Sequence, residues 1–211
     1  MGQAKRHRDA ITGANLRDAL LPRDAIARAV RDGVVARAAA LGLAGGLCGF
    51  HAAVGRVVLL ERFGIASRLA AGDFQRRVTP QVVHSYAGRG GRIDAASGAC
   101  HVWLTLAGSG ATVDFDAWEE PVRYDATARP HGPWTAPRPD HYWIGPGERA
   151  PGLEAVRPDP DATAFVEARL SRPAERRFVA AACADALHRL DGRAARAAAT
   201  ADGEPLHRTC A

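Results

Sequence analysis

The sequence predicts one domain in which helices come first, strands follow and helices return at the end. Three observations lead to this prediction. Apolar residues recur every three or four positions in two early stretches, which is typical of helices with a buried face. Alternating apolar residues on both sides of a short glycine turn indicate a β-hairpin. From Asp161 onward the spacing is helical again, and 211 residues are enough for one substantial core.

The two early helices are predicted over residues 18–43 and 48–63. The apolar positions of the first helix share one side: Ile26, Val30, Val34, Val35, Ala38 and Leu41. Gly42 and the small residues at 44–46 end it. The second helix has apolar side chains on more than one face, so we expect protein almost all around it, with Gly64 as its C-terminal cap.

The strand predictions follow from alternation. Residues 65–75 are predicted as a short strand and residues 76–100, rich in Arg, Gly, Ser and Thr, as a loop. "CHVWLTLAG" (100–108) and "ATVDFDAW" (111–118) flank the turn "GSG", so they are predicted to pair as a hairpin.

The rest of the chain is assigned by composition. Residues 1–13 are predicted as a flexible basic tail and residues 14–211 as a single domain. The proline-rich stretch 119–161 is predicted to be ordered but irregular, because otherwise its Trp and Tyr side chains would be exposed. The residues after it form a C-terminal helical extension of one or two helices with a frayed end.

Bulk composition excludes several classes of protein. The net charge of +5 comes from scattered arginines with Lys5 as the only lysine, and no nucleic-acid motif is present, so no nucleic-acid partner is expected. No apolar stretch reaches the roughly 20 residues that cross a bilayer, and the first residues lack the apolar segment of a secretory signal, so we expect a cytoplasmic protein without membrane contact. Four widely spaced cysteines are expected to be free thiols.

Cys48 stands at the predicted start of the second helix. The positive end of the helix dipole and the free N–H groups there favour thiolate over thiol. His101, at the start of the hairpin, is suited to hold that thiolate as an ion pair and later to protonate a leaving group. A carboxylate on the partner strand would orient the ring, and Asp114 and Asp116 are the candidates. Both would share one face of a regular strand, so alternation does not choose between them.

Two stretches carry a resemblance to a known family. "GGLCGFHAAVGRVVLLERFGIASRLAAGDF" and "HVWLTLAGSGATVDFDAW" resemble the transglutaminase-like group of papain-fold thiol enzymes, over about residues 40–118. In that group a small-residue turn leads into the nucleophilic cysteine, a "GI-x-AR" strand follows its helix, and an "H-x-W" strand precedes the aspartate strand. The resemblance implies an α+β fold in which the cysteine helix packs on an antiparallel sheet.

The resemblance also implies roles for the candidate residues. Cys48 would be the nucleophile, His101 the base and acid, and an aspartate the group that orients the ring. The apolar residue that usually precedes the aspartate slightly favours Asp114 over Asp116. The Cys48 N–H would serve the oxyanion hole, and Gln75 or a tryptophan indole is a candidate second donor.

Other interpretations of these residues remain open. A zinc site built from Cys48, His51 and His101 is the main rival, but close ligand pairs are absent, so neither metal nor cofactor is expected. His51 is then a residue behind the site or on the surface. Cys100 is expected to face away from the site and to pack. The four tryptophans, Trp103, Trp118, Trp134 and Trp143, are expected in the core or in a pocket wall.

The expected function is that of a thiol enzyme forming an acyl-enzyme on Cys48. The acyl group of a peptide or amide substrate would pass to water or to an amine, since hydrolysis and transfer share the first half-reaction. Arylamine acetyltransferases and the leader-peptide proteases of lasso-peptide pathways use the same triad. The alternative is an inactive binding or scaffold protein on the same fold.

Overall fold

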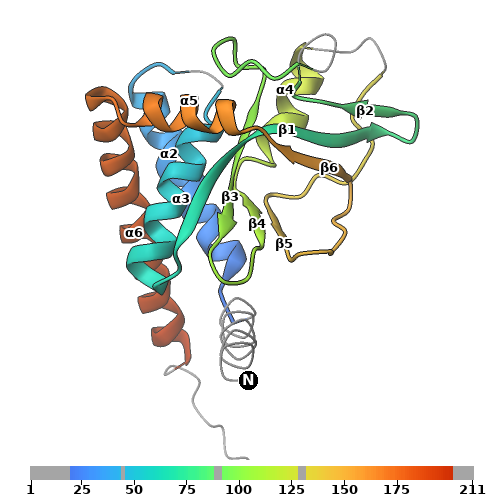
Figure 1. Cartoon of the computed structure of the whole chain (residues 1–211). Helices are drawn as coiled ribbons and strands as arrows, with labels where there is room; N and C mark the ends of the chain where they lie inside the picture. Colours follow the sequence, from blue (N-terminus) through green and yellow to red (C-terminus); the bar gives the residue numbers. More distant parts are fainter. Residues whose placement is uncertain (1–19, 44–45, 88–91, 128–131, 202–211) are drawn as a thin grey trace, which may run out of the picture.

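The protein is described by a computed structural model that covers residues 20–43, 46–87, 92–127 and 132–201. This part contains five helices and one antiparallel, curled sheet, so the chain belongs to the α+β class (Figure 1). The helices are α2 (Arg23–Ala40), α3 (Cys48–Phe63), α4 (Glu119–Thr127), α5 (Pro160–Leu170) and α6 (Pro173–Ala201). The predicted tail over 1–13 lies outside the described residues, and so does the end of the chain after residue 201.

The sheet is built around the long strand β1. Its strands are β1 (Ser67–Thr79), β2 (Val82–His84), β3 (His101–Leu106), β4 (Thr112–Asp114), β5 (Tyr142–Ile144) and β6 (Leu153–Pro158). They follow the order β2-β1-β3-β4-β5, while β6 pairs with β1. Gly72 pairs with both His101 of β3 and Pro158 of β6, which places these two strands on opposite edges of β1.

Strand β1 therefore brings two later segments together. One edge pairs with β3 over residues 67–72 and then with β2 over residues 76–79. The end of β2 pairs with Arg76 and the start of β3 pairs with Gly72, so both lie along the middle of β1 although the chain between them is long. His84 and His101 therefore lie along the same edge of β1.

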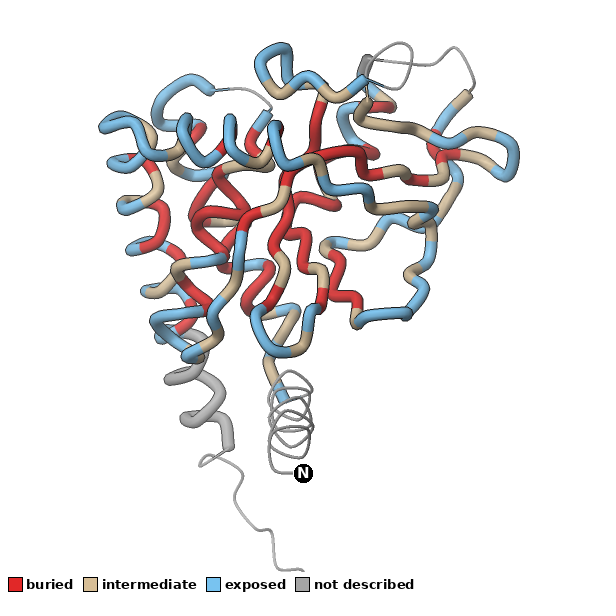
Figure 2. Tube along the Cα trace, viewed as in Figure 1, coloured by how far each residue is buried: buried red, intermediate tan, exposed pale blue. Residues whose placement is uncertain are grey.

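Helices α2, α3, α5 and α6 gather on one side of the molecule, while α4 lies apart from them near β2 (Figure 1). Helix α3 packs against β1 and β3 on one flank and against α2 and α6 on the others. Its apolar side chains point in several directions, and Val54, Val58 and Leu59 are fully buried. Figure 2 shows this buried band running along α3 into the central strands. Arg56, Leu60, Glu61 and Arg62 are exposed, so the prediction that protein surrounds this helix on almost all sides holds for its first half only.

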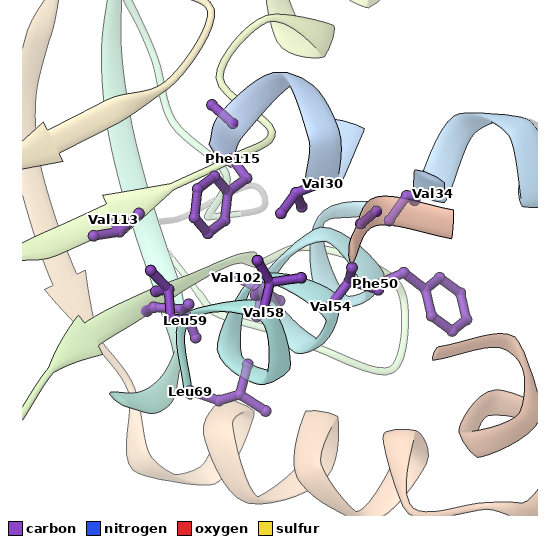
Figure 3. Close-up of a cluster of buried hydrophobic side chains, with 14 of the residues drawn as sticks. Val30, Val34, Phe50, Val54, Val58, Leu59, Leu69, Val102, Val113 and Phe115 are labelled. Carbon is purple, nitrogen blue, oxygen red and sulfur yellow. The ribbon is translucent and has the colours of Figure 1, made fainter. Parts of the chain in front are cut away.

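The core joins α3 to the hairpin. Figure 3 shows Phe115, which follows β4, among buried side chains that include Val30 of α2 and Val113 of β4. The ring comes close to α3 because residue 55 is glycine: a Cβ there would lie 2.2 Å from Cε2 of Phe115. Helix α3 ends at Gly64, whose φ of 66° is left-handed and whose N–H donates to the carbonyl of Leu60, as predicted for the cap.

Several element predictions need correction. The strand predicted over residues 65–75 is not short, because β1 continues to Thr79, where it gains β2 and β6 as partners. The predicted loop at 76–100 therefore contains the end of β1 and all of β2. The described residues of the stretch 119–161 include α4, β5 and β6, so the prediction that this stretch is irregular is wrong. The hairpin is confirmed, with Leu104 paired with Val113, and the C-terminal part forms two helices.

No helix in the described ranges combines the length and the apolar composition needed to cross a lipid bilayer.

Candidate active site

A pocket of about 700 Å³ opens where α3 begins. Its walls come from the start of α3, from the end of β2 and the residues after it, from the segment before β3 and the start of β3, from α4 and from α5. Cys48 and His101 both line it, so the pocket brings together two of the predicted residues that lie far apart in the sequence.

Cys48 is the first residue of α3, as predicted, and it is half-buried. The residue before it, Leu47, offers no side-chain cap to the helix. The first backbone N–H groups of α3 therefore have no capping side chain, and they carry the partial positive charge of the helix start. A nucleophilic sulfur at this position lies in a field that stabilises negative charge.

His101 is part of the pocket wall and is only 1% exposed. Its ring is held between Tyr86, with ring centroids 4.6 Å apart, and Phe74, at 4.9 Å. Burial disfavours the charged ring, but the Asp114 carboxylate and the contact with Cys48 outweigh it, so the pKa of His101 lies well above its ordinary value. The surroundings of the ring therefore favour its charged form.

Asp114 is the carboxylate next to that ring. Its Oδ2 lies 3.0 Å from Nε2 of His101, and both side chains are almost fully buried. Its Oδ1 accepts a hydrogen bond of 2.9 Å from the backbone N–H of Asp116, which holds the carboxylate in place. Because Asp114 engages Nε2, Nδ1 is the ring atom that remains for the thiol.

Asp116 has a different partner. Strand β4 ends at Asp114, so the two aspartates do not continue one regular strand. The Asp116 Oδ1 lies 2.9 Å from Nδ1 of His51, one turn after Cys48 on α3. His51 is fully buried, so the surface position considered for it is wrong. The pair ties the end of the hairpin to the helix that carries the cysteine.

Tyr86, which covers one face of His101, is held by a residue that the sequence analysis missed. The buried carboxylate of Asp73, on β1, accepts hydrogen bonds from the Ser85 hydroxyl at 2.7 Å and from the Ala87 N–H at 3.2 Å. Gln75 donates to the other oxygen at 2.6 Å. Burial opposes the charge of Asp73, but these bonds lower its pKa. They fix the short segment on which Tyr86 stands.

This bonding also affects the candidate oxyanion donors. The Gln75 amide is used by Asp73, and Gln75 is absent from the described pocket lining. None of the four tryptophans lies in that lining either. Trp103, Trp134 and Trp143 are buried, and Trp118 is half-buried. Backbone N–H groups at the start of α3 are the donors that remain beside the sulfur.

A second cluster of buried charges lies behind the pocket. Nη1 of Arg76, 1% exposed, lies 2.9 Å from Oε2 of Glu120, while the other carboxylate oxygen lies 3.3 Å from Nε2 of His84. Burial raises the pKa of Glu120 to about 7, although Arg76 opposes the rise. Burial and the neighbouring Asp116 carboxylate raise the pKa of Glu119 to about 7. Both glutamates stand at the start of α4, whose polar sequence gave no sign of burial.

Cys100 is buried in the main core, as expected of a packing residue, and burial raises the pKa of its thiol to about 11. It also contributes to the pocket wall beside His101. The expectation that it faces away from the site therefore holds only in part.

Three groups in the site could hold a metal ion. The sulfur of Cys48, a ring nitrogen of His101 and a carboxylate oxygen of Asp116 lie within 4.8 Å of one another. The rival zinc set of Cys48, His51 and His101 is not the one brought together; Asp116 takes the place of His51.

Comparison with known proteins gives a fold but no family. No protein-family model and no curated protein match the chain. A solved structure described as "the crystal structure of genomics APC5867" superposes with a TM-score of 0.57 at 15% identity, covering 78% of this chain and 79% of that one. A likeness at this identity concerns the arrangement of the backbone alone.

Proposed function

We propose that the protein is a thiol enzyme of the transglutaminase-like, papain-fold type, with Cys48 as nucleophile, His101 as acid and base, and Asp114 as the residue that orients the ring. The observation that carries the proposal is the contact of 3.0 Å between His101 and Asp114 at the wall of the pocket that Cys48 lines. The order of the cysteine helix and the hairpin in the chain supports the family resemblance.

The proposed chemistry has two half-reactions. The thiolate of Cys48 attacks the carbonyl carbon of an amide, forming a C–S bond and a tetrahedral oxyanion. Backbone N–H groups at the start of α3 stabilise that oxyanion. The C–N bond then breaks as the His101 imidazolium gives its proton to the departing amine. The acyl-enzyme passes its acyl group to water or to a second amine, whose proton returns to the now neutral ring.

Thiol labelling tests this proposal without a known substrate. Native protein is treated with limiting iodoacetamide near neutral pH and the adducts are mapped by peptide mass spectrometry. We expect Cys48 to react before Cys100 and Cys183, and His101→Ala to slow the reaction about tenfold or more. His188→Ala, on the exposed face of α6, is the control and leaves the rate unchanged. Equal labelling of all accessible thiols would instead favour an inactive binding protein on this fold.

A metal site is the second candidate, and the proximity of Cys48, His101 and Asp116 favours it. Three protein ligands beside an open pocket are typical of a catalytic zinc centre. Elemental analysis of protein purified without chelator separates the two candidates. Stoichiometric zinc that protects Cys48 from iodoacetamide, and whose removal by a chelator exposes the thiol, would replace the acyl-enzyme proposal.

A further inference from the structure

The positive charge of the pocket lining extends beyond the site residues. Arg169 of α5 and Arg123 of α4 line the same pocket as Cys48, from two different walls. Among the described lining residues the only carboxylate is that of Asp116, which is 3% exposed and already lies 2.9 Å from His51. The described lining thus includes two arginines, and its one carboxylate is buried and already paired.

The two arginines affect the pKa values of neighbouring groups. Arg169 favours the ionised form of the Cys100 thiol, which places its cation within electrostatic reach of the residue next to His101. Burial lowers the pKa of His84, and Arg76 and Arg123 lower it further. Arg123 also lowers the pKa of Glu119, so its charge acts on that carboxyl group as well. Arg169 is exposed, and the apolar Val166 and Leu170 of α5 line the same pocket.

The chemistry of arginine indicates what such a wall would recognise. A guanidinium presents a planar fork of donors that matches a carboxylate or a phosphate group. Inside a pocket with low-dielectric walls, a positive field also raises the local concentration of anions. The apolar side chains of Val166 and Leu170 lie beside Arg169, so an acyl chain that ends in an anionic group fits this wall.

We infer that the acyl donor of this site carries an oxyanion group, a carboxylate or a phosphate, which Arg169 binds with the help of Arg123 while the scissile carbonyl faces Cys48. The inference rests on the proposed function, since it names the class of substrate for the same thiol.

A matched pair of alkylating agents tests it. Iodoacetate and iodoacetamide differ in having a carboxylate or an amide at the same position. Each forms a C–S bond with the thiolate and releases iodide. The measured quantity is the ratio of the two rates at Cys48. We expect Arg169→Gln to lower the iodoacetate rate several-fold and to leave the iodoacetamide rate within a factor of about two, with a smaller effect from Arg123→Gln.

Arg172→Gln is the matched control, because it removes the same charge from an exposed position outside the described pocket lining and leaves the ratio unchanged. The ratio of the wild-type protein should also fall as salt is raised. Circular dichroism verifies that each variant is folded.

Two further arms distinguish the source of the oxyanion. Succinate and inorganic phosphate are added as competitors of iodoacetamide labelling, and the one that protects Cys48 in the wild type but not in Arg169→Gln identifies the group. An unchanged rate ratio in both arginine variants, with protection by neither anion, would overturn the inference. That result differs from failure of the proposed function, in which Cys48 is no more reactive toward iodoacetamide than the other thiols.

Discussion

Gly55 of α3 lies in direct contact with the ring of Phe115, the residue between Asp114 and Asp116. The absence of a side chain on the helix lets the aromatic ring enter the core, while the carboxylates on either side of it reach His101 and His51. The packing of Phe115 against Gly55 therefore also determines where the two aspartates lie.

Replacement of Gly55 tests this connection. Gly55→Ala places a methyl group against Phe115, and overpacking of this kind costs about 1–3 kcal/mol. We expect a lower free energy of unfolding in urea and slower alkylation of Cys48, because the two aspartates move with the ring. Gly192→Ala on α6, where a Cβ meets no atom within 4 Å, is the control. It should stabilise the protein by up to about 1 kcal/mol. Equal effects from both variants would contradict the argument.

The His101–Asp114 pair makes stability depend on pH. The pKa of His101 is raised in the folded protein, so the stabilisation is complete below the ordinary imidazole pKa of about 6.5 and is lost as pH rises through the folded value. Asp114→Asn should cost about 3–5 kcal/mol near pH 6 and less at higher pH. Urea unfolding at several pH values measures the difference, and an NMR titration of the ring should show a lower pKa in the variant.

Asp191→Asn is the control for this prediction. Asp191 pairs with Arg62 at 3.0 Å on the surface, where such pairs contribute up to about 1 kcal/mol. A loss of stability in Asp114→Asn that does not change with pH would speak against the ionised pair.

Glu119 also makes stability fall as pH rises, but over a lower pH range than His101. Burial and Asp116 raise the pKa of its carboxyl to about 7 from an ordinary 4.5, so between these values the unfolded chain has lost a proton that the folded protein keeps. This group therefore lowers stability as pH rises across that window. Glu119→Gln should remove a pH-dependent loss on the order of 3 kcal/mol, as measured by urea unfolding. Glu167→Gln, at an exposed position on α5, should retain the wild-type slope, and equal slopes in all three proteins would refute the assignment.

Two adjacent arginines on β1 differ in what they contribute. Arg76 is buried, donates to the carbonyl of Ala117 as well as to Glu120, and lies over the Trp134 ring at 4.9 Å. Arg76→Ala leaves a buried carboxylate without its partner, which costs about 3–5 kcal/mol. Arg77→Ala removes an exposed pair with Glu154 and should cost less than about 1 kcal/mol. Thermal unfolding of the two variants gives the comparison, and similar losses would disprove it.

Local patterns in the sequence predicted part of this arrangement. The bounds of α3 follow from the glycines before Cys48 and at Gly64, and hairpin pairing brings an aspartate beside His101. The choice between the two aspartates required the structure, because β4 ends at Asp114 and the Asp116 side chain turns to His51. Alternation within the sequence contains no information on where a strand stops pairing.

The parts of the fold and the site that local patterns did not predict depend on contacts between distant segments. The end of β1, from Arg76 onward, falls in the predicted loop because its partners β2, β6 and α4 come from later segments. The stacking of Tyr86 on His101 has no local signal, since it is fixed through Asp73 on another strand. Buried glutamates at the start of α4 likewise become intelligible only with Arg76 and His51 in place.

The pairing of Gly72 with both β3 and β6 has a consequence for biosynthesis. When the ribosome has passed residue 118, the nascent chain already contains Cys48, His101 and Asp114, but it lacks β6 and the α5 wall that carries Val166 and Arg169. Cys48 is thus translated well before the helix that completes its pocket. Completion of the pocket waits for a strand that closes the opposite edge of β1 late in synthesis.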